Sequence, residues 1–146
     1  MSLGDIRVSN YEVSTRIPRV FVAMQFSAPF NEIYSEVISK VCSDLGLEAW
    51  RADDIYGPGV IIEDITRQLI ESQAIIVEIT PVNANVYYEL GYAHAMGKPT
   101  ILVADKNTKL PFDVSPFRVL FYENSIPGRS HFEEGLRKHL AAIFGR

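Results

Sequence analysis

Near the middle of the chain, residues 83–99 read N-A-N-V-Y-Y-E-L-G-Y-A-H-A-M-G-K-P. An apolar run precedes this segment at residues 74–79, and another follows it at residues 100–104. Both runs are short, rich in β-branched residues and without polar alternation, which is typical of strands buried on both faces of a parallel sheet. The segment between them is predicted to be one helix, because an Asn can cap its start and Gly97 can end it.

The same alternation of strands and helices is predicted along most of the chain. Further strands are expected at about residues 20–24, 47–51 and 118–122, and further helices at about 33–45, 60–72 and 132–144. Crossovers of roughly twenty residues between strands require parallel pairing. We therefore expect residues 18–146 to form a single doubly wound α/β domain, with helices on both faces of a five-stranded parallel sheet in the flavodoxin-like order 2-1-3-4-5. Residues 1–17 are expected to be an N-terminal arm.

Composition and charge exclude several classes of protein. The 146 residues are 47% hydrophobic and 22% charged, which is ordinary for one globular domain. The net charge of −4 and the lack of a basic run argue against a nucleic-acid partner. No apolar stretch approaches the ~18 residues that a membrane span needs, and because no apolar h-region stands near residue 1, no secretory signal is expected. A cytoplasmic protein is the simplest expectation.

Motifs for metals and cofactors are missing from the sequence. The single cysteine, Cys42, follows Val41 on the apolar face of the first predicted helix, so it is expected in the core. His94, His131 and His139 have no partner at the spacing of a metal site or a catalytic triad, and are interpreted as structural or surface residues. No GxGxxG follows the first strand and no P-loop is present, so we expect no metal and no cofactor.

Polar side chains gather where the predicted strands reach their carboxyl ends, which is where open α/β sheets bind ligands. Glu89, one turn into the central helix, is the predicted catalytic centre, and Asp64, early in the preceding helix, is a second catalytic candidate. Clustered carboxylates would raise one another's pKa values, which keeps an acid ready to donate a proton. The predicted substrate-binding residues are Met24, Phe26, Asp53, Glu78, Asn83 and Asn85.

Other roles remain open for several of these residues. Asp53 can be a solvated loop charge, like the neighbouring Asp54. Asn85 can serve as a helix cap rather than as a ligand. Tyr87 and Tyr88 can be packing residues or a stacking wall, and periodicity does not decide between these.

Residues 83–99 resemble the signature helix of the nucleoside 2-deoxyribosyltransferase-like superfamily. Three further motifs resemble its compact bacterial branch: V-F-V-A-M-Q-F near the first strand, R-A-D-D at residues 51–54 and P-F-D at residues 111–113. The resemblance covers roughly Val20 to Tyr122. That branch is also related to TIR-like domains that cleave nicotinamide from NAD.

The resemblance implies roles for particular residues. Glu89 matches the glutamate that attacks the anomeric carbon of the sugar, and Asp64 is the nearest match to an aspartate that contacts the base. Where the family has a second base-binding aspartate, this chain has Asn83. The asparagine that the family supplies from a neighbouring subunit is also unmatched, since Pro116 and Phe117 occupy that region.

Two functions follow as alternatives. The first is an enzyme that cleaves or transfers the N-glycosidic bond of a nucleoside, nucleotide or NAD, with Glu89 stabilising or trapping an oxocarbenium-like sugar. In it, Asp64 or Glu78 would protonate a departing purine, whereas nicotinamide leaves without an acid. The second is a non-catalytic module that binds a nucleotide signal or mediates interaction through the same crevice.

The central helix also predicts assembly. Tyr88, Tyr92 and Met96 form a stripe beside the core-facing side of this helix, and the family completes its pockets across subunits. We expect a homodimer or larger homo-oligomer, which light scattering at micromolar concentration would detect. A strict monomer under those conditions would contradict this expectation.

Overall fold

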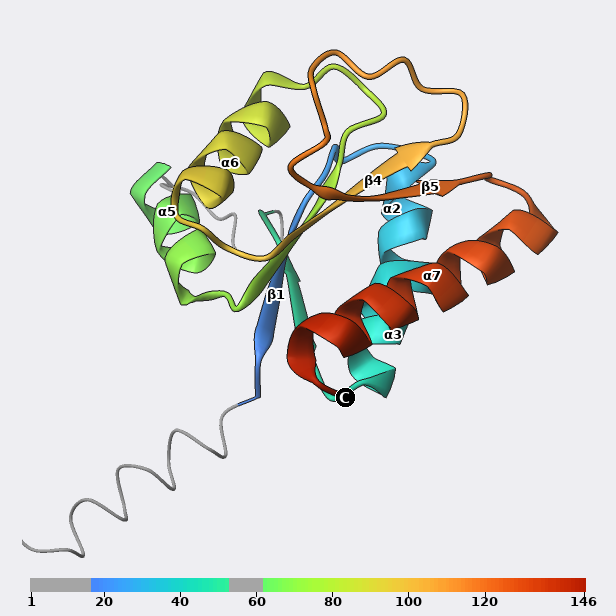
Figure 1. Ribbon diagram of the computed structural model, residues 1–146, viewed down its shortest axis with the longest axis horizontal. Coiled ribbons are helices and arrows are strands. Elements are labelled where there is room, and N and C mark those ends of the chain that lie inside the picture. Colours follow the sequence, from blue (N-terminus) through green and yellow to red (C-terminus); the bar gives the residue numbers. More distant parts are fainter. Residues whose placement is uncertain (1–16, 53–61) are drawn as a thin grey trace, which may run out of the picture.

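The computed structural model describes residues 17–52 and 62–146. Within these ranges a five-stranded parallel sheet lies between two layers of helices (Figure 1). The strands are β1 (Arg19–Ala23), β2 (Glu48–Arg51), β3 (Ala74–Glu78), β4 (Thr100–Asp105) and β5 (Arg118–Tyr122). Their order, β2-β1-β3-β4-β5 with every neighbouring pair parallel, confirms the predicted flavodoxin-like fold.

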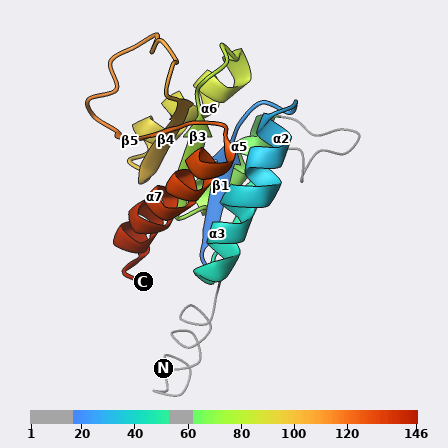
Figure 2. The same cartoon turned by 90° about the vertical axis from the view of Figure 1, so that its right-hand side faces the viewer.

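The helices cover both faces of the sheet. They are α2 (Phe30–Ile33), η1 (Tyr34–Ile38), α3 (Ser39–Asp44), α5 (Ile62–Glu71), α6 (Ala84–Ala95) and α7 (Ile126–Phe144). The first three follow one another without a break, so they form the single helix expected before Gly46, with a π-helical stretch, η1, in its middle. This helix and α7 pack on one face of the sheet, and α5 and α6 pack on the other (Figure 2).

Strand β3 is buried on both faces, as its unbroken apolar run predicts. Ile75 and Val77 point toward α5 and α6, while Ala74 and Ile76 point toward the first helix and α7. Cys42 belongs to the second of these core layers and is fully buried, which confirms its prediction as a core residue.

The helix α6 has the ends that its sequence predicts. The Asn83 side chain accepts a hydrogen bond from the Val86 amide at 3.1 Å, which satisfies one of the free N–H groups of the first turn. At the other end Gly97 takes a φ of 70°, a left-handed conformation that glycine adopts without the clash of a Cβ. The chain then turns directly into β4.

The helix α7 begins six residues earlier than predicted, at Ile126 instead of residue 132. Ser125 caps it by accepting a hydrogen bond from the Gly128 amide at 3.1 Å, and a proline stands in its first turn, where no N–H is needed. A Cβ on Gly128 would lie 2.1 Å from the Glu123 carbonyl oxygen, so this close start requires glycine. The Pro-Gly pair therefore belongs to a helix start and not to a loop.

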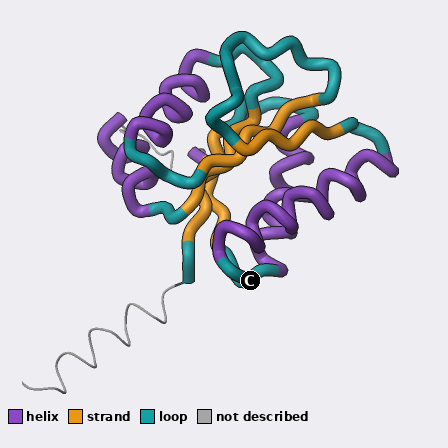
Figure 3. Tube along the Cα trace, in the orientation of Figure 1, coloured by secondary structure: helices purple, strands orange, loops and turns teal. Residues whose placement is uncertain are grey.

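The connection between β4 and β5, residues 106–117, arches over the carboxyl side of the sheet (Figure 3). Aromatic contacts hold it on α6: Tyr87 meets Phe112 edge-on at 6.0 Å between ring centroids, and His94 lies 4.8 Å from Phe117. Tyr87 is therefore a packing residue, and His94 has the structural role expected from the sequence.

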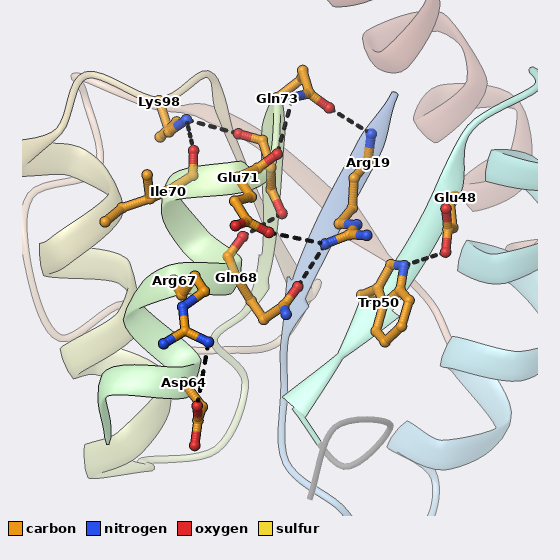
Figure 4. Close-up of polar contacts among 11 residues, drawn as sticks. Arg19, Glu48, Trp50, Asp64, Arg67, Gln68, Ile70, Glu71, Gln73 and Lys98 are labelled. Atoms are coloured by element: carbon orange, nitrogen blue, oxygen red, sulfur yellow. Dashed lines mark hydrogen bonds and ion pairs between the residues drawn. The ribbon is translucent and has the colours of Figure 1, made fainter. Parts of the chain in front are cut away.

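Polar contacts join the elements at the amino-terminal edge of the sheet (Figure 4). The Lys98 ammonium group donates hydrogen bonds to the Ile70 and Ser72 carbonyl oxygens, at 2.6 and 2.8 Å. These carbonyls lie at the C-terminal end of α5, where a positive charge is favourable. Arg19 on β1 contacts the same helix, through Gln68 at 2.7 Å and Glu71 at 3.6 Å.

The N-terminal arm expected at residues 1–17 lies outside the described residues except for Ile17. Within the described part of the chain, no helix combines enough length with enough apolar character to cross a membrane.

Lys98→Met is expected to lower the free energy of unfolding by about 1–2 kcal/mol, because two carbonyl groups lose a charged donor. Urea denaturation checks this, and Lys109→Met, which changes an exposed lysine of the 106–117 connection, is the matched control. Equal stability of the two variants would show that Lys98 contributes nothing as a cap.

Candidate active site

A small cleft lies at the carboxyl end of β1, where the chain adds β2 on one side of β1 and β3 on the other. The loop after β1 passes toward β2 on one side, and the loop after β3 enters α6 on the other, which is the switch point where this fold class binds ligands. The cleft has a volume of about 70 Å³. It is lined by Met24, Gln25, Phe26, Ala52, Asn83, Asn85, Val86 and Glu89.

Five of the eight residues predicted for the site meet in this cleft: Met24, Phe26, Asn83, Asn85 and Glu89. Asp53 lies outside the described residues. The remaining two, Asp64 and Glu78, are described but are not among the lining residues.

Glu89 is the carboxylate of the cleft, and its side chain is almost wholly removed from bulk solvent, with 6% exposure. None of the described residues donates a hydrogen bond to this carboxylate. Burial therefore acts unopposed and raises the pKa of Glu89 from 4.5 to about 7. The predicted cause, repulsion among several carboxylates around one rim, is not what raises this pKa.

Asn83 connects the start of α6 to the loop after β1. Besides capping the helix, its side-chain amide donates to the Gln25 side-chain oxygen at 3.4 Å, and Gln25 in turn donates to the Ser27 hydroxyl at 2.9 Å. Asn85 lines the cleft and does not cap the helix, so the alternative interpretation of Asn85 as the cap is wrong. Gln25 was recognisable in sequence as the first polar residue after a buried strand, but only the fold shows that it holds Asn83.

Phe26 forms the open side of the cleft and is 44% exposed. The guanidinium of Arg51, at the end of β2, lies 5.0 Å from the centre of its ring and 4.7 Å from that of Tyr34. Arg51 also donates to the Asn31 side-chain oxygen at 2.9 Å. A buried arginine between two rings thus supports the Phe26 side of the cleft, a role that no spacing in the sequence predicts.

Glu78 lies on the opposite face of the sheet from Glu89. As the last residue of β3 it follows the alternation of Ala74 and Ile76, so it points toward α7 and contacts Tyr122 of β5. Its side chain is fully buried, and burial raises its pKa. The structure therefore does not bring Glu78 to the cleft.

Asp64 stands in the first turn of α5 with a side chain that is 39% exposed, 3.8 Å from the Arg67 guanidinium (Figure 4). Tyr88 faces away from the cleft and stacks on Tyr92 at 6.4 Å, with 49% exposure. Neither tyrosine lines the cleft. Among the described residues no group of three or more His, Cys, Asp or Glu side chains is arranged to hold a metal ion.

Solved structures with this fold include a 2-deoxyribosyltransferase and a CMP N-glycosidase. A 2-deoxyribosyltransferase from Bacillus psychrosaccharolyticus has a TM-score of 0.61 with 15% identity, over 79% of this chain and 90% of its own. A CMP N-glycosidase from Clostridium botulinum has a TM-score of 0.58 with 21% identity, over 82% of this chain and 96% of its own.

A signal receiver domain from Vibrio parahaemolyticus also shares the fold, with a TM-score of 0.56 and 12% identity over 88% of this chain and 94% of its own. No protein-family model and no curated protein matches the chain. At these identities the likeness establishes the fold, and enzymes and a signalling domain both occur among the similar structures.

The raised pKa of Glu89 predicts a pH-dependent effect on stability. A carboxyl group with a higher pKa in the folded state than in the unfolded state binds protons more tightly when folded, so stability falls as pH rises from 4.5 to about 7. The shift corresponds to a decrease of about 3 kcal/mol in the free energy of unfolding, which is complete above pH 7. Glu89→Gln removes this penalty.

We therefore expect Glu89→Gln to be more stable than the wild type at pH 8, by up to about 3 kcal/mol, and equally stable at pH 4. Urea denaturation at both pH values measures the difference, with Glu134→Gln on the exposed side of α7 as the matched control. A Glu89→Gln variant that is less stable than the wild type at pH 8 would contradict the burial of an unpaired carboxylate.

Proposed function

We propose that this protein cleaves or transfers the N-glycosidic bond of a nucleoside, nucleotide or NAD, with Glu89 as the group that acts on the sugar. The observation that carries the proposal is a buried carboxylate without a hydrogen-bond donor among the described residues, facing a cleft at the switch point of the sheet. The shared fold of a deoxyribosyltransferase and a CMP N-glycosidase supports it.

The chemistry uses the ionised form of Glu89. When the bond between the sugar and the base breaks, its electron pair leaves with the base, and positive charge develops at the anomeric carbon. A Glu89 oxygen stabilises this carbon or bonds to it, and water or a second base later takes its place. Because the pKa of Glu89 is about 7, about half of the molecules carry the reactive anion at neutral pH.

The cleft can hold the reacting centre but not a whole nucleoside, since ligand pockets usually measure about 300–1,000 Å³. The rest of the substrate would extend past Phe26 and Asn85, which form part of the cleft lining. The half-exposed Phe26 ring offers a flat apolar surface to a base. Met24 is buried and closes the inner wall.

Of the two acids predicted to protonate the leaving base, Glu78 lies on the other face of the sheet, so we assign this step to Asp64. Asp64 stands outside the cleft lining and would act on the part of the substrate that extends beyond the cleft. A nicotinamide leaving group is already cationic and needs no proton. Asp64→Asn is therefore expected to slow the release of a purine at least tenfold more than the release of nicotinamide, as measured by chromatography of the free bases. Equal effects on both leaving groups would exclude Asp64 as the acid.

A binding module without catalysis is the second candidate, and Asn83 favours it. The related enzymes that the sequence resembles have a carboxylate at this position, whereas the Asn83 amide is engaged in capping α6 and in holding Gln25. In that case the same cleft would bind a nucleotide and Glu89 would take no part in catalysis.

Turnover is tested by incubating the protein with deoxynucleosides, their monophosphates and NAD, followed by chromatography of free base and nicotinamide. Glu89→Gln is expected to lower the rate about 10³-fold or more, because glutamine keeps the size of the side chain but has no negative charge. The wild-type rate is expected to rise with pH, with a midpoint at about pH 7, as Glu89 loses its proton.

Glu134→Gln is the control and should keep the wild-type rate, because this side chain is 65% exposed on α7. Wild-type turnover by Glu89→Gln would show that Glu89 is not the reacting group. Binding of a nucleotide with no turnover of any substrate would favour the second candidate.

A further inference from the structure

The second buried carboxylate, Glu78, and the nearby Thr80 together link three strands at their carboxyl ends. One oxygen accepts a hydrogen bond from the Thr80 backbone amide at 2.5 Å, and the other accepts one from the Tyr122 hydroxyl at 2.5 Å. The Thr80 hydroxyl in turn accepts from the Asp105 amide at 2.9 Å. Glu78 thus joins the end of β3 to the end of β5, and Thr80 joins the loop after β3 to the end of β4.

The surroundings of Glu78 leave it little freedom. Glu78 has no exposed surface, and the Tyr122 ring is stacked on Phe132 of α7 at 4.8 Å between centroids. The Lys106 amide donates to the Tyr122 carbonyl oxygen at 2.8 Å, which fixes the backbone of β5 beside β4. The Tyr122 donor is therefore held by α7 and β4, while Thr80 is held at the end of β4 through its hydroxyl.

The loop that Glu78 holds is the one that builds the cleft. Only Pro81 and Val82 stand between Thr80 and Asn83. Asn83 caps α6, lines the cleft and contacts Gln25 on the far side of it. The position at which the chain leaves the sheet at Thr80 therefore determines where α6 begins, and with it where Glu89 lies.

Stability alone gives no reason for a carboxylate at this place. Burying a charged or polar group costs free energy even when it is well paired, and an apolar side chain of similar size would fill the same space. What an apolar side chain cannot do is accept a hydrogen bond from the Thr80 amide and so fix the direction of the loop.

We propose that Glu78 is a positioning residue for the reaction assigned to Glu89: by accepting the hydrogen bond of the Thr80 amide it fixes the Asn83 cap, and with it the position of α6, which carries Glu89 to the cleft. This inference rests on the proposed function for its purpose, but the geometry that it asserts can be measured without a substrate. Glu78 acts through the backbone on the opposite face of the sheet and touches neither the cleft nor its contents.

The test is the titration of Glu89, followed by NMR of the glutamate side-chain carboxyl carbons and assigned with Glu89→Gln. In Glu78→Met the Thr80 amide loses its acceptor, and among the described residues the loop is held to β4 only by the Ile79 amide and the Thr80 hydroxyl. The loop is then expected to shift and admit water to Glu89, whose pKa falls from about 7 by on the order of one unit. Glu78→Gln keeps the acceptor for the Thr80 amide and is expected to titrate like the wild type. Rescue by glutamine separates positioning from an effect of the Glu78 charge.

Val41→Ala and Leu140→Ala are the controls, because both create a cavity in the fully buried core on the Glu78 side of the sheet without touching the loop. Both should leave the pKa of Glu89 unchanged. If Glu78→Met does not fold, Tyr122→Phe replaces it: loss of one donor is expected to shift the pKa of Glu89 in the same direction by a smaller amount.

An unchanged pKa of Glu89 in the anchor variants, or the same fall in the controls, would overturn the proposal. An equal fall in Glu78→Gln and Glu78→Met would also overturn it, because charge would then be the cause. The substrate screen is a separate measurement: absence of wild-type turnover would refute the proposed function, whereas the titration would still decide whether Glu78 positions Glu89.

Discussion

The pairing of β1 with both β2 and β3 is the constraint on which the site depends. Because the chain adds one strand on each side of β1, the loops after β1 and β3 turn toward opposite faces of the sheet and leave a cleft between them. Most described residues of the cleft follow from this arrangement: residues 24–26 come from the first loop, and Asn83, Asn85, Val86 and Glu89 come from the second loop and α6. Ala52, just after β2, completes the lining.

Burial then gives the two carboxylates different tasks. Burial raises the pKa of both, but Glu89 has no hydrogen-bond donor among the described residues, whereas Glu78, on the other face, accepts hydrogen bonds from the Thr80 amide and the Tyr122 hydroxyl. The first arrangement costs stability above neutral pH and, under the proposed function, provides the reactive group. The second, in our inference, holds the loop that leads to α6. A single strand and helix, β3 and α6, thus carry both the proposed reacting group and its proposed support.

Sequence patterns predicted the strand order, the central helix and the position of Glu89 near the carboxyl edge of the sheet, because two-sided strands and an Asn cap are local signals. They did not predict the side of the sheet on which Glu78 lies, since a strand that is apolar throughout does not show which residues face which layer. The Glu78 contact with Tyr122 joins residues 44 positions apart, and no local signal indicates such a pair. The early start of α7 was missed because Pro127 and Gly128 are as common in loops as at helix starts.

The central claim is that the ionisation of Glu89 controls the reaction. Its most direct test compares two pH dependences in the same wild-type protein: the ionisation of the Glu89 carboxyl carbon by NMR, and the turnover of whichever substrate the screen identifies. The account predicts that both have their midpoint at about pH 7. Turnover whose midpoint is unrelated to the ionisation of Glu89 would contradict it.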